Sequence, residues 1–391
     1  MPELKHTDRK HALLSASGAS RWINCTPSPR LEEGFAESTS EFAEEGTLAH
    51  EFGDLGLNLE HKRITYEEFQ KQAETLRKSK YYSSEMMTQV AKYIDFVTEQ
   101  VNIAKQKTSG VVLLIEEKVD LTEFIEAGFG TCDANVVADG TLYVDDLKYG
   151  KGIKVDAEEN SQLKLYGLGA LMKYELAYDI HTVSLNIIQP RLDHVSTWEI
   201  SAEELVKWGE EVVKPKALMA YAGEGEMCAG DWCRWCKAKA RCRKLTEKNT
   251  EILKHDFADP QLLSDEELIE VFKQMPVITD WVKGVSTYLL SEALKGKKWP
   301  EHKIVEGRSI RKWTDEDKVR EVLATTDYKT HEYTSIKTKG IGDITTLVGK
   351  ANFEKLLGKF IIKPAGKPTL VHETDKRKAL GANEQAKEDF K

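Results

Sequence analysis

Three β-rich segments separated by glycine turns constrain the fold of this chain more than any other feature of the sequence. Apolar residues at helical spacing precede them, and a helix and two further strands follow. In order, the predicted elements are a helix at 84–107, strands at 111–121, 128–139 and 140–149, a helix at 157–176, and strands at 181–192 and 195–201. This order predicts an α/β fold with a mixed central sheet flanked by helices.

The segments before this core are predicted to be helical. Residues 13–33 are expected to contain a short helix that is capped near Ser15 or Ser17 and ends at Cys25 and the prolines, and residues 42–60 are expected to form a second helix. Beyond about residue 250 the composition shifts.

The C-terminal part of the chain is predicted to be mainly helical, with some mixed structure. Residues 264–296 are expected to form two helices, and the remainder is rich in lysine. A chain of 391 residues is long enough for two domains. We therefore expect a core at residues 1–250 and a C-terminal extension at residues 251–391, to which the sequence assigns no role.

Charge and hydropathy exclude several classes of protein. The formal net charge of −9 argues against a protein that coats nucleic acid over its whole surface, although it permits a local basic channel. No apolar run reaches the roughly 18 residues of a membrane span. The first ten residues are polar and resemble no signal peptide. These features predict a cytoplasmic protein without a membrane partner, placed in the host cytoplasm if the gene is viral.

Two aspartates and a lysine stand on the second and third predicted strands. Asp133 lies in GTCDAN, and Asp146 and Lys148 form a D-x-K pattern that places both on one strand face, opposite to Asp145. A hairpin at residues 139–140 would bring the two strands side by side. Two close carboxylates repel each other unless one is protonated or a cation lies between them. Mg²⁺ or Mn²⁺ would suit such oxygen ligands, with the lysine placed to orient water or a phosphate. The alternative is a solvated strand end without function.

This arrangement resembles the PD-(D/E)XK nuclease superfamily, whose core is a restriction-endonuclease-like fold. DLKYGKG, at residues 146–152, is similar to the D-x-K-T-G-K pattern of its RecB-like branch. In that branch a histidine within GT-x-x-H binds metal, which places this role on His50 in GTLAHE. The branch also has Q-x-x-x-Y on a later helix, matched here by Gln162 and Tyr166 in QLKLY, which share one helix face.

The resemblance implies a set of site residues. The implied catalytic residues are Asp133, Asp146, Lys148, Gln162 and Tyr166, and the implied metal ligands are His50, Asp133, Asp146 and the carbonyl of Leu147. A glutamate of the first strand, either Glu116 or Glu117, is also expected at the site. The chain departs from the family at Asp145, where a bulky apolar residue is usual.

Four of the six cysteines fall within fifteen residues, which predicts metal binding in a reducing compartment. CAGDWCRWCKAKARC contains one tight pair, Cys233 and Cys236, followed by Cys242. The remaining ligand could be the neighbouring Cys228 or the distant Cys25. A local set of four cysteines would suit zinc. Cys132, beside Asp133, is expected to be a packing residue.

The iron–sulfur-containing RecB-like nucleases are similar in this region, with three cysteines at C-x2-C-x5-C after the core and a fourth before it. This resemblance implies a [4Fe–4S] cluster on Cys25, Cys233, Cys236 and Cys242, with zinc as the alternative cofactor. Such a cluster would act as a clasp between the N-terminal helix and the segment that follows the core.

A basic segment adjoins the cysteines. Residues 234–248 contain seven Lys or Arg and one Glu, with Trp232 and Trp235 close by. Basic side chains bind phosphates and aromatic side chains can stack on unpaired bases, although these tryptophans could equally pack around the cluster. The expected DNA-binding residues are Lys151, Lys154, Arg234, Lys237 and Arg241.

The sequence therefore predicts a divalent-metal-dependent DNA exonuclease of phage recombination or replication, similar to a phage-encoded family of uncharacterised nuclease-like proteins. Its expected partners are single-stranded DNA or duplex ends, and a phage recombinase or single-strand-binding protein. The alternative is a noncatalytic DNA-binding scaffold on the nuclease fold.

Overall fold

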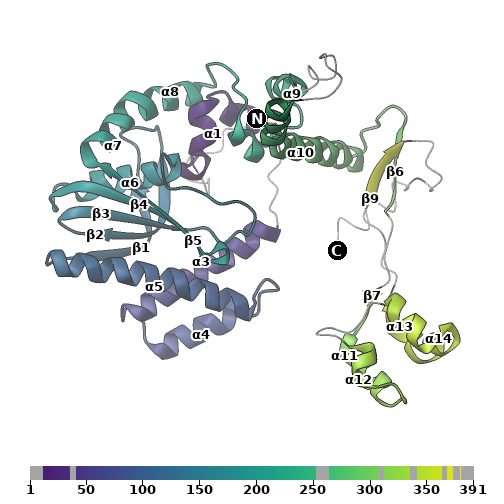
Figure 1. The fold of residues 1–391 in the computed structure, drawn as a ribbon. Helices are drawn as coiled ribbons and strands as arrows, with labels where there is room; N and C mark the ends of the chain where they lie inside the picture. The colour runs from purple at the N-terminus through teal and green to yellow at the C-terminus, as the bar shows by residue number, and fades with distance from the viewer. Residues whose placement is uncertain are drawn as a thin grey trace. The chain divides into compact units, whose positions relative to one another are not determined.

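The structure is a computed structural model that describes residues 12–35, 41–251, 264–307, 312–334, 341–362, 368–372 and 379 (Figure 1). The chain divides into two compact units, Met1–Trp281 and Val282–Lys391. None of the described helices combines the length and the apolar character that crossing a membrane requires.

A five-stranded mixed sheet forms the centre of the first unit. Its strands are β1 (Val112–Asp120), β2 (Phe129–Val137), β3 (Gly140–Leu147), β4 (Ile180–Gln189) and β5 (His194–Ser201), and they are hydrogen-bonded in this order. Only β3 and β4 pair in parallel, joined by the helix α6 (Ser161–Tyr174), while all other neighbours are antiparallel. The predicted α/β fold with a mixed sheet is confirmed.

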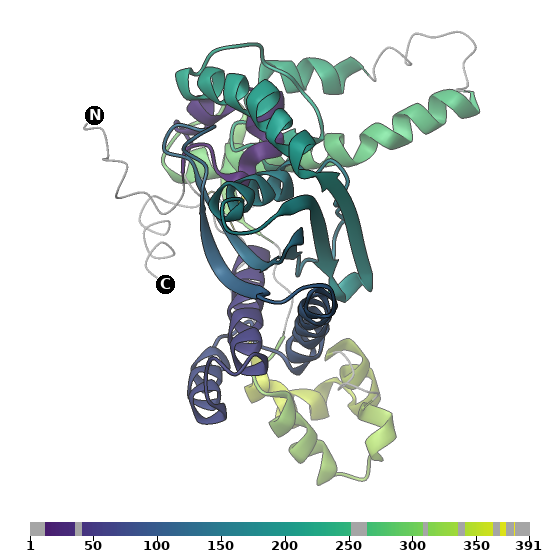
Figure 2. The same cartoon turned by 90° about the vertical axis from the view of Figure 1, so that its left-hand side faces the viewer.

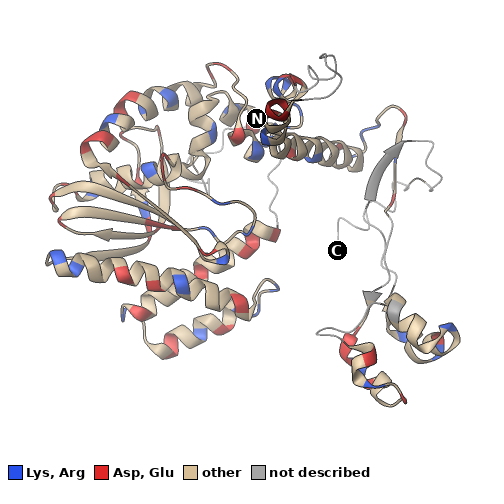
Figure 3. Ribbon diagram, in the orientation of Figure 1, with Lys and Arg blue, Asp and Glu red and all other residues tan. Residues whose placement is uncertain are grey.

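Helices cover both faces of this sheet (Figure 1). One face packs against α5 (Ser84–Lys107) and α3 (Glu41–Glu60), with α4 (Tyr66–Leu76) outside them. The other face packs against α6 and α7 (Ala202–Trp208), with α1 (Ala19–Asn24) and α8 (Lys214–Ala222) outside them. In Figure 3 the strands are mostly uncharged, whereas the helices carry both signs of charge, as expected for a sheet buried between two layers.

Alternation along β3 decides which side chains meet which layer. Leu142 and Val144 join the apolar cluster beneath α6, whereas Tyr143 and Leu147 join the cluster beneath α5. Because the end of this strand is buried on both faces, any polar residue there lies in a largely dry environment.

The N-terminal segment packs on the part of the chain that follows the sheet, and both views place α1 beside α8 (Figures 1 and 2). The Ser15 hydroxyl caps a short 3₁₀ turn by accepting from the Gly18 amide, and α1 ends at Asn24 with Cys25 as its C-cap, in agreement with the predicted end. The Thr26 hydroxyl donates to the Glu224 carbonyl at 2.6 Å. This contact joins positions 198 residues apart, so Cys25 is held near the later cysteines.

The helix α10 (Asp265–Leu294) corrects one expectation, since the predicted pair of helices is a single helix that continues through Pro276. A proline in a helix removes the hydrogen bond to the carbonyl four residues earlier, here that of Phe272. Both Phe272 and Pro276 are exposed, so water can satisfy that carbonyl.

The second unit is mainly helical. It begins with the last part of α10 and also contains the described helices α11 (Glu316–Ala324), α12 (Thr330–Tyr333), α13 (Ile341–Val348) and α14 (Lys350–Leu357), which share one apolar cluster. Two short antiparallel pairs accompany them, β6 (His302–Glu306) with β9 (Pro368–His372), and β7 (Lys312–Trp313) with β8 (Ile361–Ile362).

Candidate metal centre and cysteine cluster

The middle of β2 and the end of β3 bring the two predicted aspartates together. Ala134 pairs with Asp145 in the antiparallel register, which puts Asp133 next to Asp146 across the two strands. Asp133 Oδ2 accepts a hydrogen bond from the Leu147 amide at 2.7 Å, which fixes the orientation of this carboxylate. Asp146 is 2% exposed.

The helix α3 brings His50 to the same place. Its Nδ1 lies 3.0 Å from Asp133 Oδ1. One ligand atom each from His50, Glu116 and Asp133 lie within 4.8 Å of one another. Three groups from α3, β1 and β2 therefore converge on one point, and their N and O donors suit a divalent cation.

The structure distinguishes the two glutamates that the sequence left open. Glu117 faces a different neighbourhood, where it forms an ion pair with Lys173. Glu116 joins the site because its backbone is in the left-handed region, with φ of 50°, at an interruption of the pairing between β1 and β2. A non-glycine residue in that region is strained by about 1–2 kcal/mol, and such strain is often concentrated at functional sites.

Lys148, Gln162 and Tyr166 form a connected polar network beside the carboxylates. Lys148 Nζ lies 2.7 Å from Asp146 Oδ2 and donates to Gln162 Oε1 at 3.1 Å. The Gln162 amide nitrogen donates to the Tyr166 hydroxyl at 2.9 Å and lies 3.4 Å from Asp146 Oδ1. Asn160 is the N-cap of α6, and its side chain accepts hydrogen bonds from the amides of Gln162 and Leu163. This cap fixes the first turn of the helix, in which Gln162 lies.

Burial and mutual charge shift the pKa values of these groups. Burial would lower the pKa of His50, but the charge and hydrogen bond of Asp133 outweigh it and raise that pKa to about 9. Burial raises the pKa of Glu116 to about 7, with the charge of Asp133 adding to the effect. Burial also raises the pKa of Asp146, although Lys148 opposes this. The site thus holds protons that a cation would displace.

Asp145 belongs to a different network, as alternation predicts. It is fully buried, and its Oδ1 accepts from the Asn186 amide at 2.9 Å. Asn186 Oδ1 in turn accepts from the Thr197 hydroxyl at 2.7 Å. Burial raises the pKa of Asp145 to about 7. Asn186 is therefore the hydrogen-bond partner of Asp145, the position at which this chain departs from the family pattern. No pattern in the sequence predicts this role of Asn186.

Gly130 is a second residue whose role the sequence does not reveal. A Cβ atom at this position would lie 2.8 Å from Cε1 of Tyr166. The absence of a side chain on β2 therefore makes room for the tyrosine ring of α6, next to the site.

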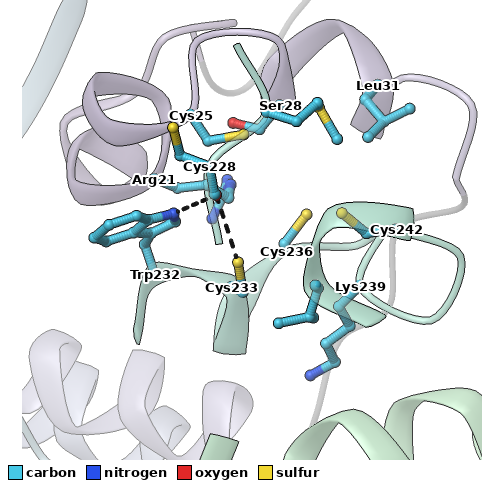
Figure 4. Close-up of a pocket in the computed structure, with 12 residues that line it drawn as sticks. Arg21, Cys25, Ser28, Leu31, Cys228, Trp232, Cys233, Cys236, Lys239 and Cys242 are labelled. Atoms are coloured by element: carbon cyan, nitrogen blue, oxygen red, sulfur yellow. Dashed lines mark hydrogen bonds between the residues drawn. The ribbon is translucent and has the colours of Figure 1, made fainter. Parts of the chain in front are cut away.

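Five cysteines line a single pocket (Figure 4): Cys25, Cys228, Cys233, Cys236 and Cys242. Burial raises the thiol pKa of Cys25 and of Cys233, and raises that of Cys236 to about 12. Cys132 lies apart from these, fully buried in the core, where its thiol donates to Asn135 Oδ1 at 3.1 Å.

Polar contacts tie this pocket to the N-terminal helices. The helix α2 (Ser28–Glu32) ends in Glu32, whose Oε2 lies 3.0 Å from an Arg21 nitrogen. Glu32 Oε1 accepts from the Lys237 amide at 2.7 Å, directly after Cys236. The carbonyl of Cys228 accepts from Trp232 Nε1 at 3.0 Å, which turns Trp232 back toward the pocket (Figure 4).

The predicted DNA-binding residues occupy two segments. Lys151 and Lys154 are exposed on the loop that follows Lys148, and Lys151 Nζ lies 3.4 Å from Glu85 Oε1. Lys237 and Arg241 are exposed beside the cysteines. Arg234 is half-buried in an ion pair with Asp280. Trp235 is 74% exposed.

Comparison with known proteins gives one extensive match. Residues 11–378 match a family described as "Protein of unknown function (DUF2800)". A solved structure titled "Crystal structure of SSO0001" has 14% sequence identity and a TM-score of 0.23, over 56% of this chain and 95% of that chain. At that TM-score the likeness carries no argument about fold or function.

Proposed function

The chain belongs to the DUF2800 family, whose function is unknown, and we propose that it is a divalent-metal-dependent deoxyribonuclease that degrades DNA from its ends. The observation that carries the proposal is the convergence of His50, Glu116 and Asp133 beside the pair of Asp146 and Lys148. A carboxylate–lysine pair next to a potential cation site is a set of groups that can support metal-assisted phosphodiester hydrolysis. The resemblance to the RecB-like PD-(D/E)XK nucleases supports the same activity.

Mg²⁺ or Mn²⁺ would be held by His50, Glu116, Asp133 and Asp146, with the Leu147 carbonyl as a further expected ligand. The donor set fits, because an imidazole nitrogen and two carboxylates already lie within 4.8 Å of one another. A cation bound there would polarise the phosphoryl group and lower the pKa of a water molecule.

The remaining residues orient the reactants. Lys148 keeps its proton, since Asp146 and Asp133 outweigh burial and raise the pKa of its ammonium group. A charged Lys148 can therefore donate hydrogen bonds to the attacking water or to a phosphate oxygen. Gln162 holds the lysine from the other side at 3.1 Å, and Tyr166 holds Gln162 at 2.9 Å. Together they limit the rotamers that Lys148 can adopt.

A [4Fe–4S] cluster on Cys25, Cys233, Cys236 and Cys242 is the cofactor that we propose for the pocket of cysteines. In a tetrahedral zinc site with Zn–S bonds of 2.3 Å, the four sulfurs lie about 3.8 Å apart. Among the described residues, no three cysteine sulfurs lie within 4.8 Å of one another. The wider spacing suits a cluster in which each cysteine binds a different iron atom.

The cluster would have a structural role. It would join Cys25 to cysteines about 200 residues later, where Glu32 and Thr26 already bridge the same two segments. When bound, the cluster would supply covalent links between the iron atoms and the four thiolates.

The experiment that tests the activity is digestion of end-labelled DNA with Mn²⁺ or with EDTA, using single strands and duplexes labelled at either end. We expect Mn²⁺-dependent release of label, and the labelled end that is lost first gives the polarity. Protein that binds DNA but leaves it intact in Mn²⁺ would instead be the noncatalytic scaffold. Asp146→Asn, which keeps the shape of the side chain, is the matched inactive control.

A further inference from the structure

The loop that follows Lys148, residues 149–155, contains two glycines that the protein itself does not require. A Cβ atom at Gly150 or at Gly152 would meet nothing within 4 Å, and neither residue has φ in the left-handed region. Alanine at such a position would stabilise the protein, because it restricts the unfolded chain. Glycine is also the usual residue where the backbone comes close to a ligand. We call residues 149–155 the lysine loop.

The lysine loop is held on both sides, so its glycines do not serve to make it flexible. At its start, the Lys148 amide donates to the Ile188 carbonyl at 2.9 Å. At its end, the side chain of Gln189 accepts from the Val155 amide at 2.7 Å and donates to the Ile153 carbonyl at 2.9 Å. Gln189 is the last residue of β4 and is 2% exposed. Two adjacent residues of one buried strand therefore fix the loop.

The exposed part of the lysine loop begins after Tyr149. This tyrosine is 3% exposed, and the guanidinium of Arg191 lies 4.6 Å from the centre of its ring. Every residue of 150–154 is exposed. Among the residues that the structure describes, none accepts a hydrogen bond from the amides of residues 150–152. A fixed segment thus presents three consecutive amides that a ligand can reach.

The charge of the lysine loop indicates the kind of ligand. Lys148, Lys151 and Lys154 bring three ammonium groups into seven residues of a chain whose formal net charge is −9. Lys151 pairs with Glu85, but both side chains are 54% exposed, and such a pair costs little to break. Backbone amides and lysines are donors that DNA-binding proteins use for phosphate oxygens.

We propose that the lysine loop is a preformed site for the phosphates of a DNA strand, with the bare backbone at Gly150 and Gly152 against the phosphate oxygens. Gln189 is its positioning residue, since it acts on DNA only through the loop. The inference rests on the proposed function, which supplies the DNA, and it assigns where the strand beside the metal site is held. Contacts to phosphates carry no sequence preference.

The test is the affinity for a fluorescein-labelled oligodeoxythymidylate, measured by fluorescence anisotropy. All variants carry Asp146→Asn in the full-length chain, so that bound DNA stays intact. Gly150→Ala and Gly152→Ala should each raise Kd by roughly fivefold or more, because the added methyl group keeps phosphates from the backbone. The unfolding temperature should not fall, since that methyl group meets no protein atom. Gly342→Ala is the matched control, because a Cβ there also meets nothing within 4 Å.

An oligonucleotide with uncharged methylphosphonate linkages separates phosphate contacts from base contacts. The Asp146→Asn protein should bind it more weakly than phosphodiester DNA, and the two loop glycine variants should bind it no worse than that protein does. Gln189→Met keeps the side-chain length but cannot hydrogen-bond to the loop. It should raise Kd for phosphodiester DNA and speed amide hydrogen exchange in residues 150–155.

Unchanged affinity in both loop glycine variants would overturn the proposal, as would a loss of affinity that accompanies a lower unfolding temperature. A loss that persists on methylphosphonate DNA would place the loop against bases and overturn the phosphate site. An Asp146→Asn protein that binds no DNA would overturn it as well. Failure of the wild type to cleave DNA in Mn²⁺ would contradict the proposed activity, whereas the glycine variants would still decide the role of the loop through their affinity.

Discussion

Lys148 Nζ lies 2.7 Å from Oδ2 of Asp146, and the Asp146 carboxylate is almost completely buried. Breaking such a pair leaves a buried charge without its partner. The relationship joins the proposed catalytic lysine to a proposed metal ligand, so a change at either residue should act on the same step.

Lys148→Met is expected to reduce DNA cleavage by roughly 100-fold or more, because the side chain keeps its length but cannot donate a hydrogen bond. The measurement is initial cleavage rate in Mn²⁺, with folding checked by thermal unfolding. Lys173→Met is the control, since Lys173 forms an ion pair with Glu117 away from the site. Equal losses of cleavage rate in both variants would contradict the proposed catalytic role of Lys148.

The affinity for Mn²⁺ should rise with pH. His50 has a pKa of about 9 in the ion-free protein because of Asp133, so at lower pH a proton must leave before Nδ1 can bind a cation. The association constant should therefore rise about tenfold per pH unit between pH 7 and 9. Below pH 7 the rise should be steeper, because Glu116, with a pKa of about 7, must also lose a proton.

Calorimetric titration with Mn²⁺ at several pH values measures this dependence. His50→Gln should lower the affinity and remove the slope between pH 7 and 9. His181→Gln should change neither, since that residue is 72% exposed and pairs with Asp179. A slope that survives in His50→Gln would show that another group holds the displaced proton.

Gly130→Ala should destabilise the protein by about 1–3 kcal/mol, because its new methyl group would crowd the ring of Tyr166. Cleavage should fall as well, since the displaced ring no longer supports Gln162. Urea unfolding and the cleavage rate test both effects. Gly46→Ala serves for comparison, because a Cβ there meets nothing within 4 Å; the idea fails if the two variants behave alike.

Substitution of single cysteines should identify the ligands of the cluster. Cys236→Ala is expected to lose iron, sulfide and visible colour, and to lower the thermal stability. If Cys25 is the fourth ligand, Cys25→Ala should do the same, whereas Cys228→Ala should keep its iron. Elemental analysis of the wild-type protein decides between iron and zinc. Zinc without iron would contradict the proposed [4Fe–4S] cluster.

Local sequence patterns could predict those parts of the fold and site that depend on neighbouring residues. Spacing by two placed Asp146 and Lys148 on one strand face, and spacing by four placed Gln162 and Tyr166 on one helix face. The structure has both pairs joined by direct polar contacts. The mixed sheet also followed from the order of the elements.

Other features depend on tertiary packing that local patterns do not contain. Strand alternation could not choose between Glu116 and Glu117, because Glu116 has a left-handed backbone that interrupts the alternation. Position 130 must be a glycine only because the ring of Tyr166 packs against it in the folded chain. The helix through Pro276 persists because its lost hydrogen bond faces solvent.

The account depends most on one cation held between His50, Glu116 and Asp133. Anomalous diffraction from crystals grown with Mn²⁺ tests this directly. The account predicts a single strong peak within bonding distance of His50 Nδ1 and of the two carboxylates, which disappears in Asp133→Asn. A map with no peak there, and with the hydrogen bond between His50 and Asp133 intact at saturating Mn²⁺, would contradict it.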